Sequence, residues 1–209
     1  MARNYERKSN FRLNVEAMVT AFILAMLIRS FIVTPFKIPT GSMEPTLHGD
    51  PKYGDRILVN RFQYYFTLPK RGEIIVFQTR GIDALDQDKD FIKRLVGLPG
   101  ETLSIENERL CINGKPVDDP ELFKNRRYIF RRFSEMRYGD PGSPITIPQD
   151  AYFVMGDNTE NSKDSRYFGF VPKKNVKGRA ILIWWPIKRM GMLSKSLAGE
   201  ECLDGIPNG

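Results

Sequence analysis

Hydrophobic residues dominate one long stretch near the start of the chain. Every residue from Ala17 to Ile28 is apolar except Thr20, and after two polar positions the apolar character resumes until Pro35, which ends any helix. A helix of a soluble core is expected to carry a polar stripe at the 3.6-residue period, and this stretch has almost none. A cleaved signal peptide is expected to be followed by small residues, which are absent here. The pattern therefore favours a single transmembrane helix, which we place at residues 15–36.

Basic residues precede this apolar stretch. Residues 1–14 hold four basic residues against one acidic residue, a net charge of +3. Positive charge beside a span keeps that end in the cytoplasm, so everything after residue 36 is expected on the outer face of the cell (inner) membrane. Arg29 lies near the outer end of the stretch, where its long side chain can reach the lipid headgroups. The sequence thus predicts a single-pass protein with a cytoplasmic N-terminus.

Beyond Lys37, short runs of β-forming residues alternate with Gly, Pro, Asn and Asp, and no second long apolar stretch follows. This pattern predicts a mainly β body over residues 37–195 and a tail at 196–209. Hairpin turns are expected at Asn107-Glu108 and Asn113-Gly114. The expected strands are Arg56–Asn60, Glu73–Gln78, Phe91–Gly97, Thr102–Glu106, Arg109–Ile112, Tyr128–Phe133, Ala151–Met155 and Ala180–Trp185.

Two further stretches of the body have two interpretations each. In 118–144, basic residues alternate with aromatic ones, which favours a hairpin with a solvated face over a surface that grips nucleic acid or lipid headgroups. The apolar run Ile181–Ile187 favours a core strand, with contact to the membrane interface as the alternative.

Composition narrows the chemistry that is available. A single histidine, His48, leaves almost no material for a histidine-ligated metal site or a Ser/His/Asp triad. Two cysteines about ninety residues apart, Cys111 and Cys202, cannot form a zinc knuckle or a redox pair. A disulfide between them is the less favoured alternative. We therefore expect no metal and no cofactor.

The net charge of the 209 residues is +7, and the basic N-terminus accounts for +3 of it. The remaining +4 is spread over 195 residues, which is too little for a nucleic-acid surface. We therefore expect no nucleic-acid partner.

The first candidate for chemistry is the segment PTGSMEPTL at residues 39–47. Ser42 follows Gly41 between two prolines, on a constrained turn where its hydroxyl is exposed and its amide N–H is free to face a developing oxyanion. Taken alone, the segment also fits an ordinary Gly- and Pro-containing turn.

The second candidate is Lys93. A serine nucleophile without a histidine needs another base, and lysine serves only when burial in apolar surroundings keeps its amine neutral. Strand alternation puts Lys93 on the same face as Phe91 and Leu95. Taken alone, the pattern also fits an exposed lysine on an edge strand.

The third candidate is the polar loop that follows the expected strand ending at Met155. Residues 156–169 read GDNTENSKDSRYFG and are dense in hydroxyl, amide and carboxylate groups. Such a loop can fix the rotamer of an amine through a serine hydroxyl, and an Asp164–Arg166 ion pair can hold the loop in place. In isolation, an Asx-rich turn explains the composition equally well.

Together the three clusters resemble, in order and spacing, the type I signal peptidase family, also called leader peptidases. The resemblance runs from the apolar stretch to about Trp185, with 104–150 matching only as a variable β insertion. It implies a mainly β fold: a signal-peptidase-type β catalytic core with a β insertion, preceded by one N-terminal transmembrane helix. The matching segments are PTGSMEPTL, GDRILVNR at 54–61, FIKRLVGLPGE at 91–101 and GDNTENSKDSRYFGFVP at 156–172.

The resemblance implies a serine endopeptidase that removes signal peptides from exported preproteins at the outer face of the membrane. Carried over by position, Ser42 is the nucleophile and Lys93 the general base. The implied partners are preprotein signal peptides and the lipid bilayer, and we expect a monomer.

Four more residues fall on positions that support the site in this family. Ser162 matches the hydroxyl that orients the lysine amine, and the Thr40 hydroxyl, together with the amide of the nucleophile, matches the oxyanion hole. Asp164 and Arg166 match a supporting ion pair. Some relatives have serine in place of Thr40, and some have two anchors where this chain shows one. The family pattern also implies shallow pockets that accept small residues at the first and third positions before the cut.

Three alternatives remain. A signal peptidase specialised for a conjugation or pilus substrate lies within the same enzyme class. A self-cleaving SOS-type repressor shares the Ser/Lys pair but carries a DNA-binding helix-turn-helix where this chain has its apolar stretch. A non-enzymatic, membrane-tethered β module would bind partners through the 118–144 face and would tolerate loss of Ser42 and Lys93.

Overall fold

The structure is a computed structural model, and most of the chain can be described from it. The C-terminal tail, and with it Cys202, lies outside the described residues, as does most of the expected strand Tyr128–Phe133. Cys111 is a buried free thiol. The described residues are 10–31, 33–82, 84–85, 88–118, 121–124, 126–129, 138 and 143–193.

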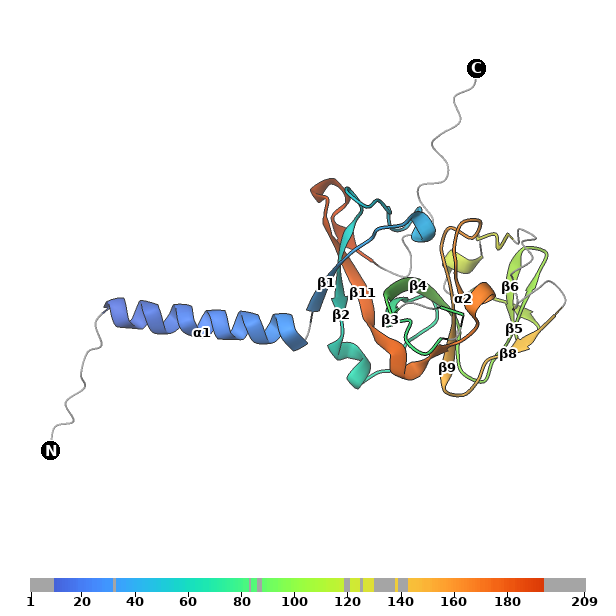
Figure 1. Ribbon diagram of the computed structural model, residues 1–209, viewed down its shortest axis with the longest axis horizontal. Coiled ribbons are helices and arrows are strands. Elements are labelled where there is room, and N and C mark those ends of the chain that lie inside the picture. Colours follow the sequence, from blue (N-terminus) through green and yellow to red (C-terminus); the bar gives the residue numbers. More distant parts are fainter. Residues whose placement is uncertain are drawn as a thin grey trace, which may run out of the picture.

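One long helix, α1 (Asn10–Phe31), extends away from a β body (Figure 1). Apolar side chains on it are exposed to solvent, among them Met18, Phe22 and Leu24. Within the described residues, no helix is both long and apolar enough to cross a membrane. The helix expected at 15–36 therefore has other bounds: α1 ends at Phe31, and residues 33–37 form strand β1 (Val33–Lys37).

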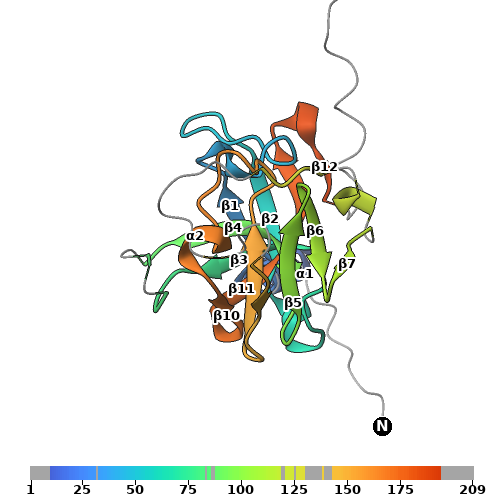
Figure 2. The same ribbon diagram turned by 90° about the vertical axis from the view of Figure 1, so that its right-hand side faces the viewer.

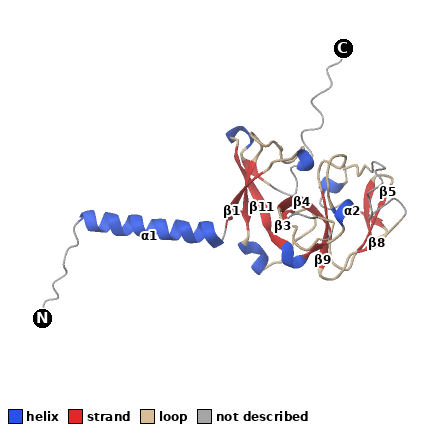
Figure 3. Ribbon diagram, viewed as in Figure 1, coloured by secondary structure: helices blue, strands red, loops and turns tan. Residues whose placement is uncertain are grey.

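The remaining elements are short and mostly strands (Figure 3). The further strands are β2 (Arg56–Asn60), β3 (Ile74–Gln78), β4 (Asp90–Gly97), β5 (Thr102–Glu106), β6 (Arg109–Ile112), β7 (Lys115–Pro116), β8 (Ile145–Thr146), β9 (Ala151–Met155), β10 (Val171–Pro172), β11 (Val176–Trp185) and β12 (Gly191–Met192). The short helices are η1 (Gly41–Met43), η2 (Phe62–Tyr65), η3 (Glu121–Phe123), α2 (Ser165–Phe168), η4 (Lys173–Asn175) and η5 (Ile187–Arg189).

Two antiparallel sheets make up the described part of the body. An eight-stranded sheet has the order β1-β2-β11-β3-β4-β9-β10, with β12 pairing with β11 outside this path. A four-stranded sheet has the order β7-β6-β5-β8. Figure 2 shows β5, β6 and β7 in front of the larger sheet. The mainly β body is therefore confirmed.

The hairpin turns are confirmed in detail. Asn107 and Glu108 have φ of 50° and 62°, and Asn113 and Gly114 have φ of 51° and 74°. Positive φ at both central residues is what a type I′ turn requires, and asparagine and glycine tolerate it best. The first turn joins β5 to β6 and the second joins β6 to β7.

Strand β11 places Ile181–Trp185 of the apolar run Ile181–Ile187 in the larger sheet, but the run is buried only in part, so a core strand is confirmed only in part. Contact of its exposed end with the membrane interface stays a prediction. β11 pairs with β2 on one side and with β3 on the other. Ile183 is buried, whereas Trp185 and Ile187, at and beyond the strand end, are 44% and 68% exposed.

The segment 126–129 corrects one expectation. Tyr128 and Ile129 lie in no strand, and Tyr128 is only 1% exposed. Tyr128 packs in a core cluster with Leu103, Phe123 and Phe153, between the two sheets. The solvated hairpin predicted for 118–144 is therefore wrong at this described part, because the aromatic side chain there contributes to the core.

Candidate active site

Ser42 lies in η1, at the start of a loop that is anchored to the core by apolar side chains. Met43 and Leu47 are fully buried in the cluster formed with β1, β2 and β11. Gly49 packs directly against the backbone of Thr40, and a Cβ there would overlap the Thr40 carbonyl. The loop therefore closes back on itself just before Ser42, which fixes the direction of the serine side chain.

Lys93 approaches Ser42 from strand β4. Its register partner is Ile75 on β3, a fully buried residue. The Lys93 amine donates a hydrogen bond to Ser42 Oγ at 2.7 Å and another to the Ile92 carbonyl at 3.0 Å. The lysine is 5% exposed, so the buried interpretation holds and the exposed edge-strand interpretation is wrong. Serine and lysine, 51 residues apart in the chain, thus meet in the fold.

Burial changes the proton affinity of this amine. Removal of water from around Lys93 lowers the pKa of its ammonium from 10.5 to about 8. The carboxylates of Asp164 and Asp157 act in the opposite direction and keep the pKa from falling further. A substantial fraction of the amine is therefore neutral near pH 8.

The polar loop predicted after β9 lies against the backbone of the serine. The amide of Asn158 donates to the Ser42 carbonyl at 3.2 Å, and its side-chain amide donates to the Gly41 carbonyl at 3.2 Å. Gly156 permits this approach, because a Cβ there would overlap both the Ser42 carbonyl and Ser162 Oγ. The third cluster thus joins the first two.

Of the four residues expected to support the site, two form an ion pair, one is buried and one is exposed. Asp164 and Arg166 form a buried ion pair with Nε–Oδ1 at 2.9 Å, and Asp164 Oδ2 also accepts from the Gly156 amide at 2.9 Å. Ser162 is buried beside Gly156, and its Oγ has no hydrogen-bond partner among the described residues. Thr40 is exposed in an extended conformation directly before η1, and its side chain makes no capping hydrogen bond.

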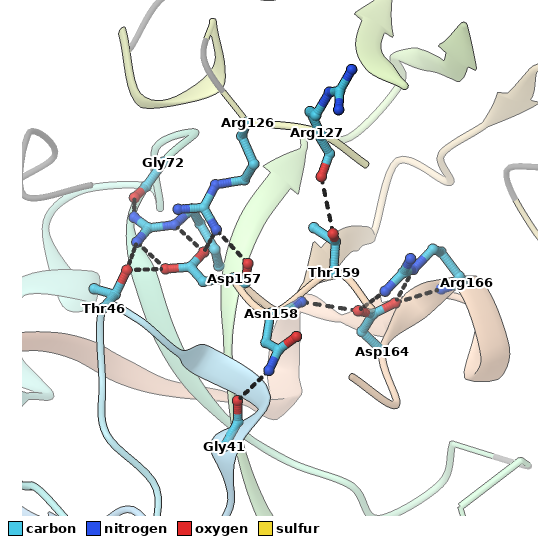
Figure 4. A network of polar contacts seen from close by, with 12 residues as sticks. Gly41, Thr46, Gly72, Arg126, Arg127, Asp157, Asn158, Thr159, Asp164 and Arg166 are labelled. Atoms are coloured by element: carbon cyan, nitrogen blue, oxygen red, sulfur yellow. Dashed lines mark hydrogen bonds and ion pairs between the residues drawn. The ribbon is translucent and has the colours of Figure 1, made fainter. Parts of the chain in front are cut away.

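A buried charge network next to the site was not foreseen from the sequence (Figure 4). Asp157 pairs with Arg94, the residue after Lys93, and with Arg126. Asp157 Oδ2 also accepts from the Thr46 hydroxyl at 2.5 Å. Burial alone raises the pKa of the Asp157 carboxyl, but the charges of Arg94 and Arg126 and the hydrogen bonds from Arg94 and Thr46 outweigh it, so the pKa lies below its usual value.

The only sequence signal for this network was an acidic residue beginning a polar loop. Its partners come from three other segments of the chain, and such tertiary contacts leave no local pattern. Among the described residues, no three His, Cys, Asp or Glu side chains are grouped so that they could hold a metal ion.

The arrangement has the parts of a nucleophilic site. A serine hydroxyl lies within hydrogen-bond reach of a desolvated amine, and serine–lysine pairs of this kind replace the serine–histidine pair on several unrelated folds. Fold and site together thus define the class: a mainly β protein in which a serine hydroxyl meets a buried lysine amine.

The comparisons with known proteins give the family. The model of the family described as "Signal peptidase, peptidase S26" matches residues 12–185, and the chain belongs to this family. It is accordingly a peptidase, and the expectation drawn from the sequence motifs is confirmed.

Relatives named as signal peptidases cover most of the chain. A probable signal peptidase I-2 of Synechocystis sp. is 39% identical over 186 residues, which are 88% of this chain and 78% of the relative. Signal peptidase I S of Bacillus subtilis is 36% identical over 190 residues, 90% of this chain and 97% of the relative. A crystal structure of a signal peptidase I from Enterococcus faecalis V583 is 34% identical, covers 54% of this chain and 97% of that chain, and has a TM-score of 0.41.

Proposed function

We propose that the protein is a membrane-anchored endopeptidase that removes N-terminal signal peptides from exported preproteins, cutting after a small residue. The observation that carries the proposal is the 2.7 Å hydrogen bond from the buried Lys93 amine to Ser42 Oγ. The names of the relatives, which refer to signal peptidase I over most of this chain, support the substrate class.

In the proposed mechanism, Ser42 Oγ attacks the carbonyl carbon of the scissile peptide bond while the neutral Lys93 amine takes the hydroxyl proton. The resulting lysine ammonium then gives this proton to the leaving amine, and the C–N bond breaks to leave an acyl-enzyme ester. A water molecule, deprotonated by Lys93, attacks the ester and releases the signal peptide as a carboxylate, with the proton returning to Ser42.

The supporting residues act on this pair. We assign the Ser42 amide and the Thr40 hydroxyl to the oxyanion, since Thr40 directly precedes η1 and its side chain is not engaged in capping. We assign Ser162 to orientation of the lysine amine, because its buried hydroxyl lies beside Gly156 and has no hydrogen-bond partner among the described residues. Asp164 and Arg166 hold the loop that carries it.

We also propose that α1 anchors the protein, with the N-terminus in the cytoplasm and the β body on the outer face of the cell membrane. By length, the 22 residues of α1 reach about 33 Å, close to the thickness of a bilayer core. The described residues contain no helix that is also apolar enough to cross a membrane, so the proposal rests on the exposed apolar side chains and on the basic N-terminus. The exposure of Met18 and Phe22, at 72% and 66%, supports a lipid environment for α1. The basic residues of 1–14 support the orientation.

The test is cleavage of a preprotein by the full chain in detergent, with the new termini mapped by mass spectrometry. We expect one cut after a small residue at the end of the signal peptide, and none with Ser42→Ala. Cleavage of a single pilus-type or conjugation-type substrate, with general preproteins left intact, would instead support the specialised alternative. If folded wild-type protein cut no preprotein at all, the proposed function would be wrong.

A further inference from the structure

Arg126 lies between β7 and β8 in the chain. Its side chain nevertheless reaches the loop after β9, which contacts the backbone of Ser42. Its guanidinium Nη1 donates to the Asp157 carbonyl at 2.8 Å and lies 2.9 Å from Asp157 Oδ1. The side chain is 11% exposed and the Asp157 carboxylate 1%, so the pair is largely shielded from water. Ion pairs in such surroundings are costly to break, because a buried charge is left without its partner.

Two more hydrogen bonds hold the same segment along the loop, and Figure 4 shows the one between Thr159 and Arg127. The Thr159 hydroxyl donates to the Arg127 carbonyl at 2.9 Å, and Arg166 Nη1 donates to the Ile129 carbonyl at 3.0 Å. Between them, Tyr128 is buried in the core. Segment 126–129 is therefore docked on the active-site loop at three successive points.

Asp157 is the residue through which this docking reaches the chemistry. Its carboxylate contacts Thr46 in the loop that carries Ser42, and Arg94 next to Lys93. The following residue, Asn158, donates its amide to the Ser42 carbonyl. A displacement of Asp157 would therefore move the serine and the lysine relative to each other.

The electrostatic field at the Lys93 amine also depends on the Arg126–Asp157 ion pair. Asp157 and Asp164 are the carboxylates that act on the amine. Arg166 neutralises Asp164, and Arg94 and Arg126 neutralise Asp157. Removal of Arg126 would leave more of the Asp157 field acting on Lys93, which favours the protonated amine.

We propose that Arg126 is a positioning residue for peptide-bond cleavage: by holding Asp157, it fixes the Ser42–Lys93 geometry and balances the charge beside Lys93. This inference rests on the proposed function, and it gives residues 126–129 a task in catalysis that neither their composition nor the family match assigns.

The experiment compares Arg126→Met with Arg127→Met in the full chain in detergent. Arg127 is a matched control, because its side chain is 79% exposed and pairs with Glu108, while its carbonyl contact to Thr159 survives the substitution. The substrate is a synthetic peptide that spans a signal-peptide cleavage site with alanine at the first and third positions before the cut. For Arg126→Met we expect kcat to fall about tenfold to a hundredfold with a smaller change in KM, and the alkaline-rising limb of kcat to move to higher pH. Arg127→Met should match wild type in both.

Activity of wild type and Arg127→Met establishes the peptidase function independently of this inference. If Arg126→Met lost activity only in proportion to its folded fraction, with the pH limb unmoved, Arg126 would be merely structural and the proposal would be overturned. Should that variant not fold, Arg126→Lys decides the question, since it keeps the charge and loses the planar fork. A lowered kcat with an unmoved limb is then expected, and wild-type kcat would overturn the proposal.

Discussion

Burial and neighbouring charges act on the Lys93 amine in opposite directions. Loss of water lowers its pKa, whereas Asp164 and Asp157 raise it, and the balance lies near 8. The hydrogen bond to Ser42 Oγ makes the serine proton the one this amine can accept. In the proposed mechanism, Lys93 and Ser42 therefore act as one unit.

Substitution of either residue should abolish cleavage without unfolding the protein. Ser42→Ala and Lys93→Ala should each reduce kcat by at least about a thousandfold, because each removes half of a cooperating pair. Lys93→Arg should fail equally, since a guanidinium stays charged at any working pH. Peptide cleavage rates, with circular dichroism as the folding control, test this. Appreciable turnover by the arginine variant would exclude Lys93 as the base.

The pKa of Lys93 also sets the pH dependence of activity and of stability. Activity should rise with pH through a limb near pH 8, where the folded-state amine loses its proton. Stability follows from comparison with the unfolded chain, in which the lysine titrates near 10.5. Between these two values the unfolded chain binds more protons than the folded one, so stability rises with pH in this window. Below about pH 8 both states are protonated, and the full cost of burying the charge is present.

Lys93→Met should therefore be inactive yet more stable than wild type at pH 7. The shift from 10.5 to about 8 corresponds to about 3 kcal/mol, which is the upper limit of the expected gain. The gain should shrink as pH rises towards 10.5. Urea midpoints of both proteins at pH 7 and pH 10 measure it. A methionine variant less stable than wild type at pH 7 would mean that Lys93 is a well-paired charge and not a suppressed one.

Thr40 provides a test of the oxyanion assignment. Thr40→Val keeps the shape of the side chain and removes its hydroxyl, which we expect to lower kcat about a hundredfold with little change in KM. Thr40→Ser retains the donor and should be nearly silent. Steady-state kinetics on the two variants separate these cases. A fully active valine variant would leave the oxyanion to backbone donors alone.

At the scale of elements, the site depends on how closely the loop after β9 approaches the serine. Gly156 has no space for a Cβ, which would overlap the Ser42 carbonyl and Ser162 Oγ. Glycine at this position lets Asn158 reach the backbone of the serine. The loop geometry is therefore set by one missing side chain.

Gly156→Ala should separate the loop from η1. We expect a destabilisation of about 1–3 kcal/mol and a fall in kcat larger than the loss of folded protein explains. Gly191→Ala is the matched control, because a Cβ there meets nothing within 4 Å, and its stability should change by less than about 0.5 kcal/mol. Urea melts and cleavage rates of both variants give the comparison. If the two variants had the same stability and the same kcat, the close approach of this loop to Ser42 would not be needed for activity.

Strands formed by clear runs of β-forming residues were predictable from the sequence, and very short ones were not. β2, β5, β6 and β9 have the bounds predicted from such runs between turn residues. β1 was missed because its residues continue an apolar stretch, and Pro35 was interpreted only as a helix end. Proline is tolerated there because β1 lies at the edge of the sheet. The two-residue strands β7, β8, β10 and β12 are too short to show any period.

The same distinction applies to the site residues. Alternation in β4 indicated a buried Lys93, since apolar neighbours on one face of a strand point into a core. Arg126 looked solvent-exposed because it lies in a charge-rich segment, and its partner Asp157 is 31 residues away in the chain. Contacts between a loop and an insertion depend on the assembled fold, so no local pattern could have revealed them.

At the scale of the whole molecule, the short stretch of chain after α1 limits how far the active site can lie from the end of this helix. Ser42 follows the end of α1 at Phe31 by eleven residues, five of which form β1. Eleven residues span at most about 40 Å when fully extended. If α1 lies in the membrane, the serine is therefore held near the bilayer surface, where a signal peptide that is itself embedded presents its cleavage site.

Deletion of residues 1–31 should leave peptide cleavage intact and remove binding to the membrane. β1 remains to pair with β2, so the shortened protein should fold and cleave a soluble peptide with kcat/KM within about threefold of the full chain. It should, however, leave the membrane fraction on alkaline extraction, and it should process a membrane-embedded preprotein far more slowly, because the effective concentration supplied by the anchor is lost. The full chain carrying Ser42→Ala serves as the control that pellets with membranes and cleaves nothing. A truncated protein that still pelleted would show that the β body itself binds the bilayer, and the anchor proposed for α1 would then be unnecessary.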